Sequence, residues 1–208
     1  MKSQMIQINK ISQYDIGIIW SLVSLTEDNR ICFRHNQKYF IESLTKYFKN
    51  NIYLQQRSKT KPDIQYVLKT NQLDIPSLME YGWTERNSNI RNIPIMSDYK
   101  DFLRAYIEIH GVLNYAIRYR KDKTKYKKLR LRIYGNINLI KSINQILSIN
   151  TSVTIKSLEI LKNSKTSILN YQLLDEIKSI FLYLQGQPYC KEYWDDINEK
   201  LNNPIIDG

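Results

Sequence analysis

The expected order of helices and strands occurs twice along this chain, and this repetition restricts the fold more than any other feature. From residue 98 onward, helical and alternating apolar spacings predict helix, strand, strand, helix, strand, strand and helix. The first half predicts the same order with a shortened first hairpin. A unit of about 90 residues is too long for a solenoid repeat. We therefore expect an α+β (mixed α/β) fold in which two pseudo-symmetric αββαββα units pack into one body.

The individual elements follow from local patterns. Apolar periodicity predicts helices over 12–25, 37–50, 75–83, 98–111, 136–150, 173–186 and 190–203. Alternation predicts strands over 30–36, 51–59, 63–71, 112–120, 127–135, 152–161 and 166–173. Ser12 and Asn136 are suitable N-caps, and the helix after Asn136 is expected to bury a face made of Ile137, Ile140, Ile143 and Leu147.

A polar stretch separates the two expected units. Residues 84–97 contain Pro94 and show no periodicity, which is typical of a linker. We therefore expect a first half over 1–83 and a second half over 98–208. Because both units lie in one chain, a monomer is the expected state.

The net charge is +11, from 31 basic and 20 acidic side chains in 208 residues. Such an excess favours a polyanionic partner, namely DNA, RNA or an anionic membrane surface. No apolar run approaches the roughly 18 residues of a membrane span, and the first ten residues lack a signal-peptide core. We expect a cytoplasmic, nucleoid-associated protein of a bacterial or phage-infected cell. Cys32 and Cys190 form no CxxC pair, so no metal site, disulfide framework or cofactor is predicted.

The segment "KKLRLRIY" over 127–134 predicts a strand with two different faces, because side chains alternate along a strand. With its partner strand it forms a basic face of Arg118, Arg120, Lys128, Arg130 and Arg132. The opposite face is apolar and carries Ile117, Tyr119, Leu129, Leu131 and Ile133. Such a two-stranded ribbon fits a DNA major groove, where Arg contacts guanine edges. Phosphate contacts are expected from turn lysines, namely Lys123, Lys125 and Lys127.

The first half carries a less basic version of this surface. One face of 51–59 is expected to present Tyr53, Gln55, Arg57 and Lys59, and the strand over 30–36 adds Arg30 and Arg34. Gln and Arg are residue types that contact base edges. A solvated sheet face is the simpler interpretation of both surfaces, but like charges directly opposite each other repel, and solvated faces usually mix signs.

The segment "LRAYIEIHG" over 103–111 resembles the motif of the LAGLIDADG homing endonucleases. The following residues, 130–147, resemble the strand and helix that come next in that family, and "DIGIIWSLVS" over 15–24 is a weaker copy of the motif. Gly17 and Ala105 then occupy the position where that family needs small residues, since its two motif helices pack closely. The resemblance implies saddle-shaped antiparallel sheets that hold double-stranded DNA.

The same resemblance implies an acid near the end of each motif helix, where it binds the divalent metal that assists phosphodiester cleavage. Here the two positions hold Leu22 and His110. Leu cannot bind a metal, and His is a poor ligand for Mg²⁺. Glu108 lies two residues earlier, about 200° round the helix. Glu27 and Asp28 could approach only if the first helix were longer, and His110 could alternatively act as a base.

The sequence therefore favours a sequence-specific double-stranded DNA-binding protein on a catalytically inactive fold of this kind, acting as a regulator of transcription or of a mobile element. Alternatives remain. They are an active homing endonuclease, an RNA maturase, and a protein–protein module such as a phage inhibitor of a host defence protein. The acidic last helix could contact a partner, but we expect it to pack Trp194 on the core with its acids in water.

Overall fold

The computed structural model describes residues 5–58, 61–85, 90–162 and 164–203. Within these ranges, no helix has the length and apolarity needed to cross a membrane. The first half contains a 3₁₀ helix, η1 (Ile8–Lys10), then α1 (Gln13–Leu22), β1 (Ser24–Leu25), β2 (Ile31–His35), α2 (Lys38–Glu42), β3 (Tyr53–Ser58), β4 (Lys61–Thr70) and α3 (Ile75–Glu80). The second half contains α4 (Lys100–His110), β5 (Gly111–Tyr119), β6 (Lys125–Gly135), α5 (Ile137–Asn150), β7 (Glu159–Ile160), β8 (Ser167–Tyr171), α6 (Leu174–Leu184) and α7 (Lys191–Asn202).

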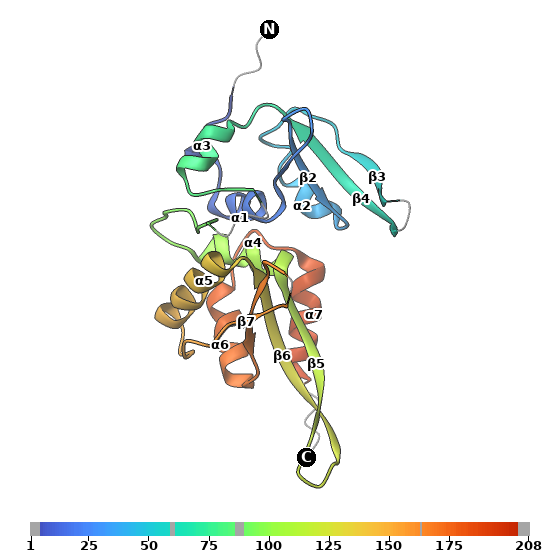
Figure 1. The fold of residues 1–208 in the computed structure, drawn as a ribbon, viewed down its shortest axis with the longest axis vertical. Coiled ribbons are helices and arrows are strands. Elements are labelled where there is room, and N and C mark those ends of the chain that lie inside the picture. Colours follow the sequence, from blue (N-terminus) through green and yellow to red (C-terminus); the bar gives the residue numbers. More distant parts are fainter. Residues whose placement is uncertain (1–4, 59–60, 86–89, 163, 204–208) are drawn as a thin grey trace.

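The two sheets share one topology. Their strand orders are β1-β2-β4-β3 and β5-β6-β8-β7, and all neighbouring strands are antiparallel. Figure 1 shows the first sheet in the upper half of the molecule and the second in the lower half, with α1 and α4 between them. The predicted α+β class, with the αββαββα order in each half, is confirmed.

Helices α1 and α4 form the centre of the molecule. Ser12 caps α1, because its Oγ accepts a hydrogen bond from the Asp15 N–H at 3.2 Å. Helix α1 packs against α4, and nearly all of its residues are buried. A Cβ on Gly17 would lie 2.6 Å from the Phe102 carbonyl oxygen and 2.8 Å from Ala105 Cβ. Only glycine permits this close approach of the two helices.

Each sheet buries one face. In the second sheet, Leu129, Leu131 and Ile133 of β6 point into the core, where α4, α5 and α6 all pack against this strand. In the first sheet, Phe33 is completely buried and stacks on Phe48 with ring centroids 5.6 Å apart. The alternation over 127–134 therefore correctly separates the core side of β6 from its outer side, whereas in the first sheet Cys32 and Val67 are buried although they share a face with Arg34 and Lys69.

Helix α7 covers the edge of the second sheet beside β5. Trp194 is buried and packs edge-to-face on Phe181 at 5.6 Å, while the Lys200 ammonium donates to the Leu113 carbonyl at 3.0 Å. The acidic residues of the helix are exposed, namely Glu192, Asp195, Asp196 and Glu199. The expected packing of Trp194, with the acids in water, is found.

The prediction of a strand over 152–161 is wrong for most of its length. Within this stretch the structure has the short strand β7, Glu159–Ile160, which pairs with β8. The backbone of Lys156 bonds instead to a side chain of α5. The Asn144 amide donates to the Lys156 carbonyl at 2.8 Å, and Asn144 Oδ1 accepts from the Lys156 N–H at 3.1 Å. These two bonds replace the ladder bonds that a strand would make.

Two predicted helices also differ in detail. The helix expected over 37–50 ends at Glu42, where Thr45 Oγ1 donates to the Glu42 carbonyl at 2.7 Å and turns follow. In α5, Leu139 takes the buried position that we expected for Ile137, which is partly exposed. The cap by Asn136 is as predicted, since its Oδ1 accepts from the Leu139 N–H at 2.9 Å.

The described residues of the predicted linker, 84–85 and 90–97, lie in no helix or strand. They nevertheless contact the core. Arg91 is 6% exposed and donates to the Trp20 carbonyl at 3.0 Å and to the Thr84 carbonyl from Nε at 2.7 Å. The division into separate halves at this stretch stays a prediction.

Candidate nucleic-acid interface

One side of the second sheet, away from the helices, is strongly basic. Residues that pair directly across antiparallel strands share a face. Asn114 pairs with Arg130, and Ala116 pairs with Lys128. We use the name basic face for four side chains on this side of the sheet, namely Arg118, Lys128, Arg130 and Arg132.

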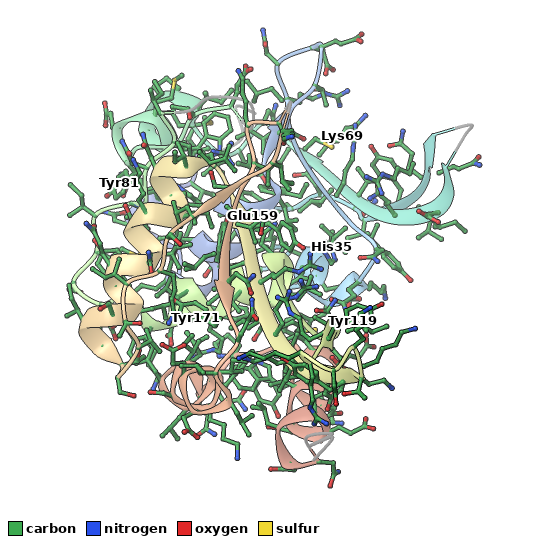
Figure 2. The ribbon with its side chains drawn as sticks, turned by 60° about the horizontal axis from the view of Figure 1, so that its bottom comes forward. His35, Lys69, Tyr81, Tyr119, Glu159 and Tyr171 are labelled. Carbon is green, nitrogen blue, oxygen red and sulfur yellow. The ribbon has the colours of Figure 1, made fainter. Side chains whose placement is uncertain are left out.

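The positive charges on the basic face affect one another. The pKa of Arg130 is lowered from its ordinary value, first by partial burial and then by the nearby Arg132 and Arg118. Glu159, on the edge strand β7, acts in the opposite direction (Figure 2). Like charges held together in this way favour the binding of an anion that offsets their repulsion.

Neighbouring side chains orient these guanidinium groups. Arg118 Nη2 donates to Gln172 Oε1 at 3.1 Å, and Arg130 Nη2 donates to Asn114 Oδ1 at 3.5 Å. The buried Nε atoms of Arg130 and Arg132 have no hydrogen-bond partner within the described part of the chain. Amide partners orient an arginine without neutralising it, so the positive charge remains available to a ligand.

The β5–β6 hairpin extends well beyond the helices (Figure 1). Lys123 lies in its turn with a φ of 69°, but Lys125 and Lys127 belong to β6, which corrects their expected place in the turn. They pair with Tyr119 and Ile117, so they lie on the face opposite the basic face. Tyr119 and Ile117 are 63% and 62% exposed, because none of the helices in the described ranges reaches this end of the sheet (Figure 1).

Arg120 lies just beyond β5, where its N–H donates to the Thr124 carbonyl at 2.9 Å. Its guanidinium is over the Tyr126 ring, 5.6 Å from the centroid. Tyr126 pairs with Arg118 and therefore lies on the basic face. Arg120 consequently extends the basic face toward the hairpin tip.

The corresponding face of the first sheet is more polar than charged. Tyr53 pairs with Val67 and Gln55 pairs with Gln65, so both β3 residues share a face with Gln65. The Lys69 ammonium lies over the Tyr53 ring at 5.8 Å. Gln65 and Lys69 were not predicted as candidates, although the alternation along β4 places them on this face.

The remaining candidates of β3 are less regular. A register shift between Gln56 and Ser58 interrupts the alternation at Arg57, which is exposed. Lys59 lies outside the described residues. Four residues were expected on one face of this strand, namely Tyr53, Gln55, Arg57 and Lys59. The pairing of β3 with β4 places Tyr53 and Gln55 on a common face.

Arg34 and Arg30 occupy different settings. Arg34 lies in β2 opposite Val67, and its Nε donates to Cys32 Sγ at 3.2 Å. Arg30 precedes the strand instead of belonging to it, and it forms an ion pair with Asp28 at 2.6 Å. Its charge is therefore partly compensated.

The ends of α1 and α4 lack acids, as the sequence indicates. Leu22 is the last residue of α1 and His110 the last of α4, where the His110 ring lies 4.6 Å from the Tyr106 ring. Glu27 and Asp28 lie in the turn after β1, so the idea that a longer helix brings them to this centre is wrong. Within the described ranges, no three His, Cys, Asp or Glu residues are grouped as a metal site.

Glu108 is buried on the other side of α4, with 5% exposure. Its carboxylate accepts hydrogen bonds from the Tyr14 hydroxyl at 2.5 Å, the Trp194 Nε1–H at 2.6 Å and the Cys190 N–H at 3.0 Å. Burial raises its pKa above the ordinary value. Glu108 therefore joins α1, α4 and α7, and it is not placed to bind a metal at the helix ends.

Neither a family model nor a curated protein matches the sequence. The structure, however, is similar to that of the LAGLIDADG homing endonuclease I-LtrWI bound to target DNA, with a TM-score of 0.58 at 15% identity over 91% of this chain and 89% of that chain. The meganuclease I-AabMI bound to uncleaved DNA gives 0.57 at 11% over 90% of each chain. I-SmaMI bound to cleaved DNA gives 0.56 at 10% over 91% and 87%. Nearly the whole chain therefore has the fold of the LAGLIDADG homing endonucleases.

Proposed function

We propose that this protein binds a specific sequence of double-stranded DNA and does not cleave it. The observation that carries the proposal is the basic face of the second sheet, combined with helix ends that hold Leu22 and His110 in place of acids. In this role the protein acts as a monomeric regulator of transcription or of a mobile element, such as one carried by a phage.

The residue types on the two sheets suggest how the DNA is contacted. A two-stranded ribbon fits the major groove, where Arg bonds to guanine and Gln to adenine in bidentate fashion. Arg130 and Arg132 therefore favour guanines in one half-site, while Gln55 and Gln65 favour adenines in the other. Lys123 at the hairpin turn would contact backbone phosphates.

The absence of cleavage follows from the chemistry of the helix ends. Hard divalent ions such as Mg²⁺ prefer oxygen ligands, which a Leu side chain cannot provide and a His side chain replaces poorly. Glu108 already accepts three hydrogen bonds in the interior. Without an acid at either helix end, the metal-assisted attack of water lacks its metal ligands.

Binding and cleavage can be tested together in a gel shift on fragments of the source genome, with Mg²⁺ present, at ~50 and ~200 mM salt. Unspecific phosphate contacts weaken steeply with salt, so selective retention at the higher concentration would indicate specific binding. All DNA is expected to stay intact. Specific cutting would contradict the proposed inactivity. Failure to bind any fragment selectively would instead favour RNA or an acidic protein, such as a host defence protein, as partner.

The basic face is tested by the double variant Arg130→Ala/Arg132→Ala. Loss of a base contact weakens binding by about 1–3 kcal/mol, so the pair should lower affinity for the selected fragment by at least tenfold. The matched control is Lys141→Ala/Lys178→Ala, which removes the same charge from exposed positions on α5 and α6. Equal affinities of the two double variants would refute the assignment of the basic face.

A further inference from the structure

Two neighbouring side chains on the basic side of the second sheet each hold a buried polar atom without a partner. Within the described part of the chain, neither Arg132 Nε nor Asn170 Oδ1 makes a hydrogen bond. Arg132 of β6 pairs directly with Asn170 of β8, so the two side chains lie next to each other on one face. The first atom is a donor and the second an acceptor, yet they do not bond to each other. Buried polar atoms without partners cost free energy, so a ligand that bonds to both would stabilise this arrangement.

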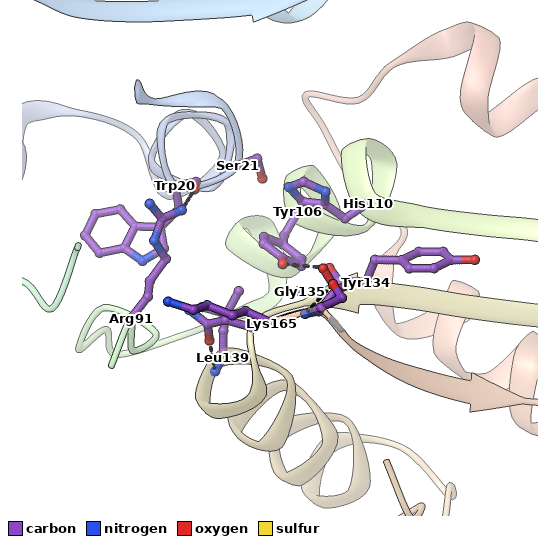
Figure 3. A pocket seen from close by; sticks show the side chains of 12 residues that line it. Trp20, Ser21, Arg91, Tyr106, His110, Tyr134, Gly135, Leu139 and Lys165 are labelled. Carbon is purple, nitrogen blue, oxygen red and sulfur yellow. Dashed lines mark hydrogen bonds between the residues drawn. The ribbon is translucent and has the colours of Figure 1, made fainter. Parts of the chain in front are cut away.

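Both side chains are reached from the open side of the sheet. A pocket of about 580 Å³ lies beside the ends of the two central helices, where Arg91 and Lys165 are among the lining residues (Figure 3). Arg132 and Asn170 are not among the described residues that line it, and both are half-buried on the side of the sheet away from the helices. The Arg132 guanidinium lies over the Tyr134 ring, 5.4 Å from its centroid. The Asn170 amide can turn about its last side-chain bond, which brings Oδ1 outward without moving the backbone.

The acceptors on this side come from β7 and β8. Glu159 of β7 pairs with Ile168 of β8. Ile168 in turn pairs with Tyr134, so Glu159 lies on the same side of the sheet as Asn170 and is exposed there (Figure 2). A carboxylate repels phosphate groups, so this part of the sheet suits base edges better than the DNA backbone. Hydrogen-bond donors are therefore supplied by the β5–β6 hairpin, and acceptors by the strands beside it.

We propose, on the basis of the proposed DNA binding, that Arg132 and Asn170 together contact a single G·C base pair. In the major groove such a pair presents two acceptors, guanine N7 and O6, beside one donor, the cytosine N4 amino group. Arg132 donates to the guanine, and Asn170 Oδ1 accepts from the cytosine of the same pair. In an A·T pair neither base has two adjacent acceptors, so the bidentate contact of the arginine would be lost. Asn170 is thereby a specificity-determining residue.

The pairing is tested on the DNA fragment selected in the gel shift, one G·C pair at a time. Cytosine is replaced by 2-pyrimidinone, which lacks the amino group, or guanine by 7-deazaguanine, which lacks the N7 acceptor. The variant Asn170→Leu removes the acceptor with little change in side-chain volume. At one G·C pair, 2-pyrimidinone should weaken wild-type binding about tenfold more than it weakens binding of Asn170→Leu. Both proteins bind the same duplexes, so the base-pair hydrogen bond lost with 2-pyrimidinone cancels from this comparison.

The same pair should identify the arginine. There 7-deazaguanine should weaken binding of the wild type and of Asn170→Leu alike, but have little effect on Arg132→Ala. The matched control is Asn198→Leu, which changes an exposed asparagine of α7 and should respond as the wild type does.

A separate measurement excludes a merely structural role of Asn170. Without DNA, Asn170→Leu should be at least as stable as the wild type in urea, because it removes a buried acceptor that has no partner. Lower stability would contradict an unpaired oxygen and overturn the pairing. Absence of selective binding by the wild type would refute the proposed function itself. Selective binding in which wild type and Asn170→Leu respond equally to 2-pyrimidinone at every pair would overturn only the contact with a G·C pair.

Discussion

The contact between α1 and α4 at Gly17 allows a quantitative prediction for Gly17→Ala. The new Cβ would lie 2.6 Å from the Phe102 carbonyl oxygen and 2.8 Å from Ala105 Cβ. Ordinary contacts of a Cβ begin at 3.4 Å. The two helices would therefore have to separate by roughly an ångström, and a backbone carbonyl cannot rotate away as a side chain can.

Two opposing terms determine the net effect. Alanine is favoured over glycine inside a helix by about 1 kcal/mol. Overpacking of a well-packed core costs about 1–3 kcal/mol, and the rigid carbonyl places this site in the upper part of that range. We expect the free energy of unfolding to fall by about 1–2 kcal/mol, which for a protein of this size lowers the unfolding temperature by about 2–4 °C per kcal/mol.

Urea unfolding of four proteins separates the two contacts: wild type, Gly17→Ala, Ala105→Gly and the double variant. Ala105→Gly alone should lose about 1 kcal/mol of helix propensity. In the Gly17→Ala background it should cost less, because it removes the 2.8 Å contact while the Phe102 contact remains. Additive effects would mean that only the carbonyl contact matters. A Gly17→Ala protein as stable as the wild type would refute the close packing.

Three further predictions concern other parts of the molecule. Burial raises the pKa of Glu108, so its ionisation destabilises the folded state. Relative to Glu108→Gln, the wild type should be most stable below the ordinary carboxyl pKa of about 4.3 and should lose stability as pH rises through the raised pKa. Urea unfolding of both proteins at several pH values measures this. A difference in free energy of unfolding that stays the same at every pH would contradict the prediction. Asn136→Ala removes the cap that accepts from the Leu139 N–H and should cost about 1 kcal/mol, whereas Asn136→Ser should retain most of it, by the same measurement. Gln55→Ala and Arg130→Ala should each weaken the preference for one base by about 1–3 kcal/mol, and the two affected bases should lie in different half-sites. Selection of bound sequences from randomised DNA measures this. Weakened preference in the same half-site would contradict the proposal that each sheet contacts its own half-site.

Much of the fold could be predicted from local patterns. The alternation over 127–134 correctly separates the core side of β6 from its basic side, because the period of a strand depends only on backbone geometry. The same holds for the cap at Asn136. The need for a small residue at Gly17 came instead from the resemblance to the homing endonucleases, because it depends on the approach of a second helix. The seven-element order of the second half was predicted because most of its elements carry their own periodicity, whereas β1 of the first half lies within the helix predicted over 12–25.

The candidate site was predictable only in part. Arg118, Arg130 and Arg132 are apparent from one hairpin, but Lys69 and Gln65 gain significance only once β3 pairs with β4. The places of Lys125 and Lys127 depend on where the turn ends, which alternation alone does not determine.

The sequence by itself determined the repeated order of elements and the basic side of one hairpin, because these features depend on neighbouring residues along the chain. Its resemblance to the homing endonucleases also marked Leu22 and His110 as positions without an acid. Tertiary structure alone decided that Glu108 is a buried acceptor for Tyr14 and Trp194, and that Arg91 and Lys165 line one pocket. These arrangements join residues more than 70 positions apart, and such contacts are set by packing between elements rather than by any local pattern.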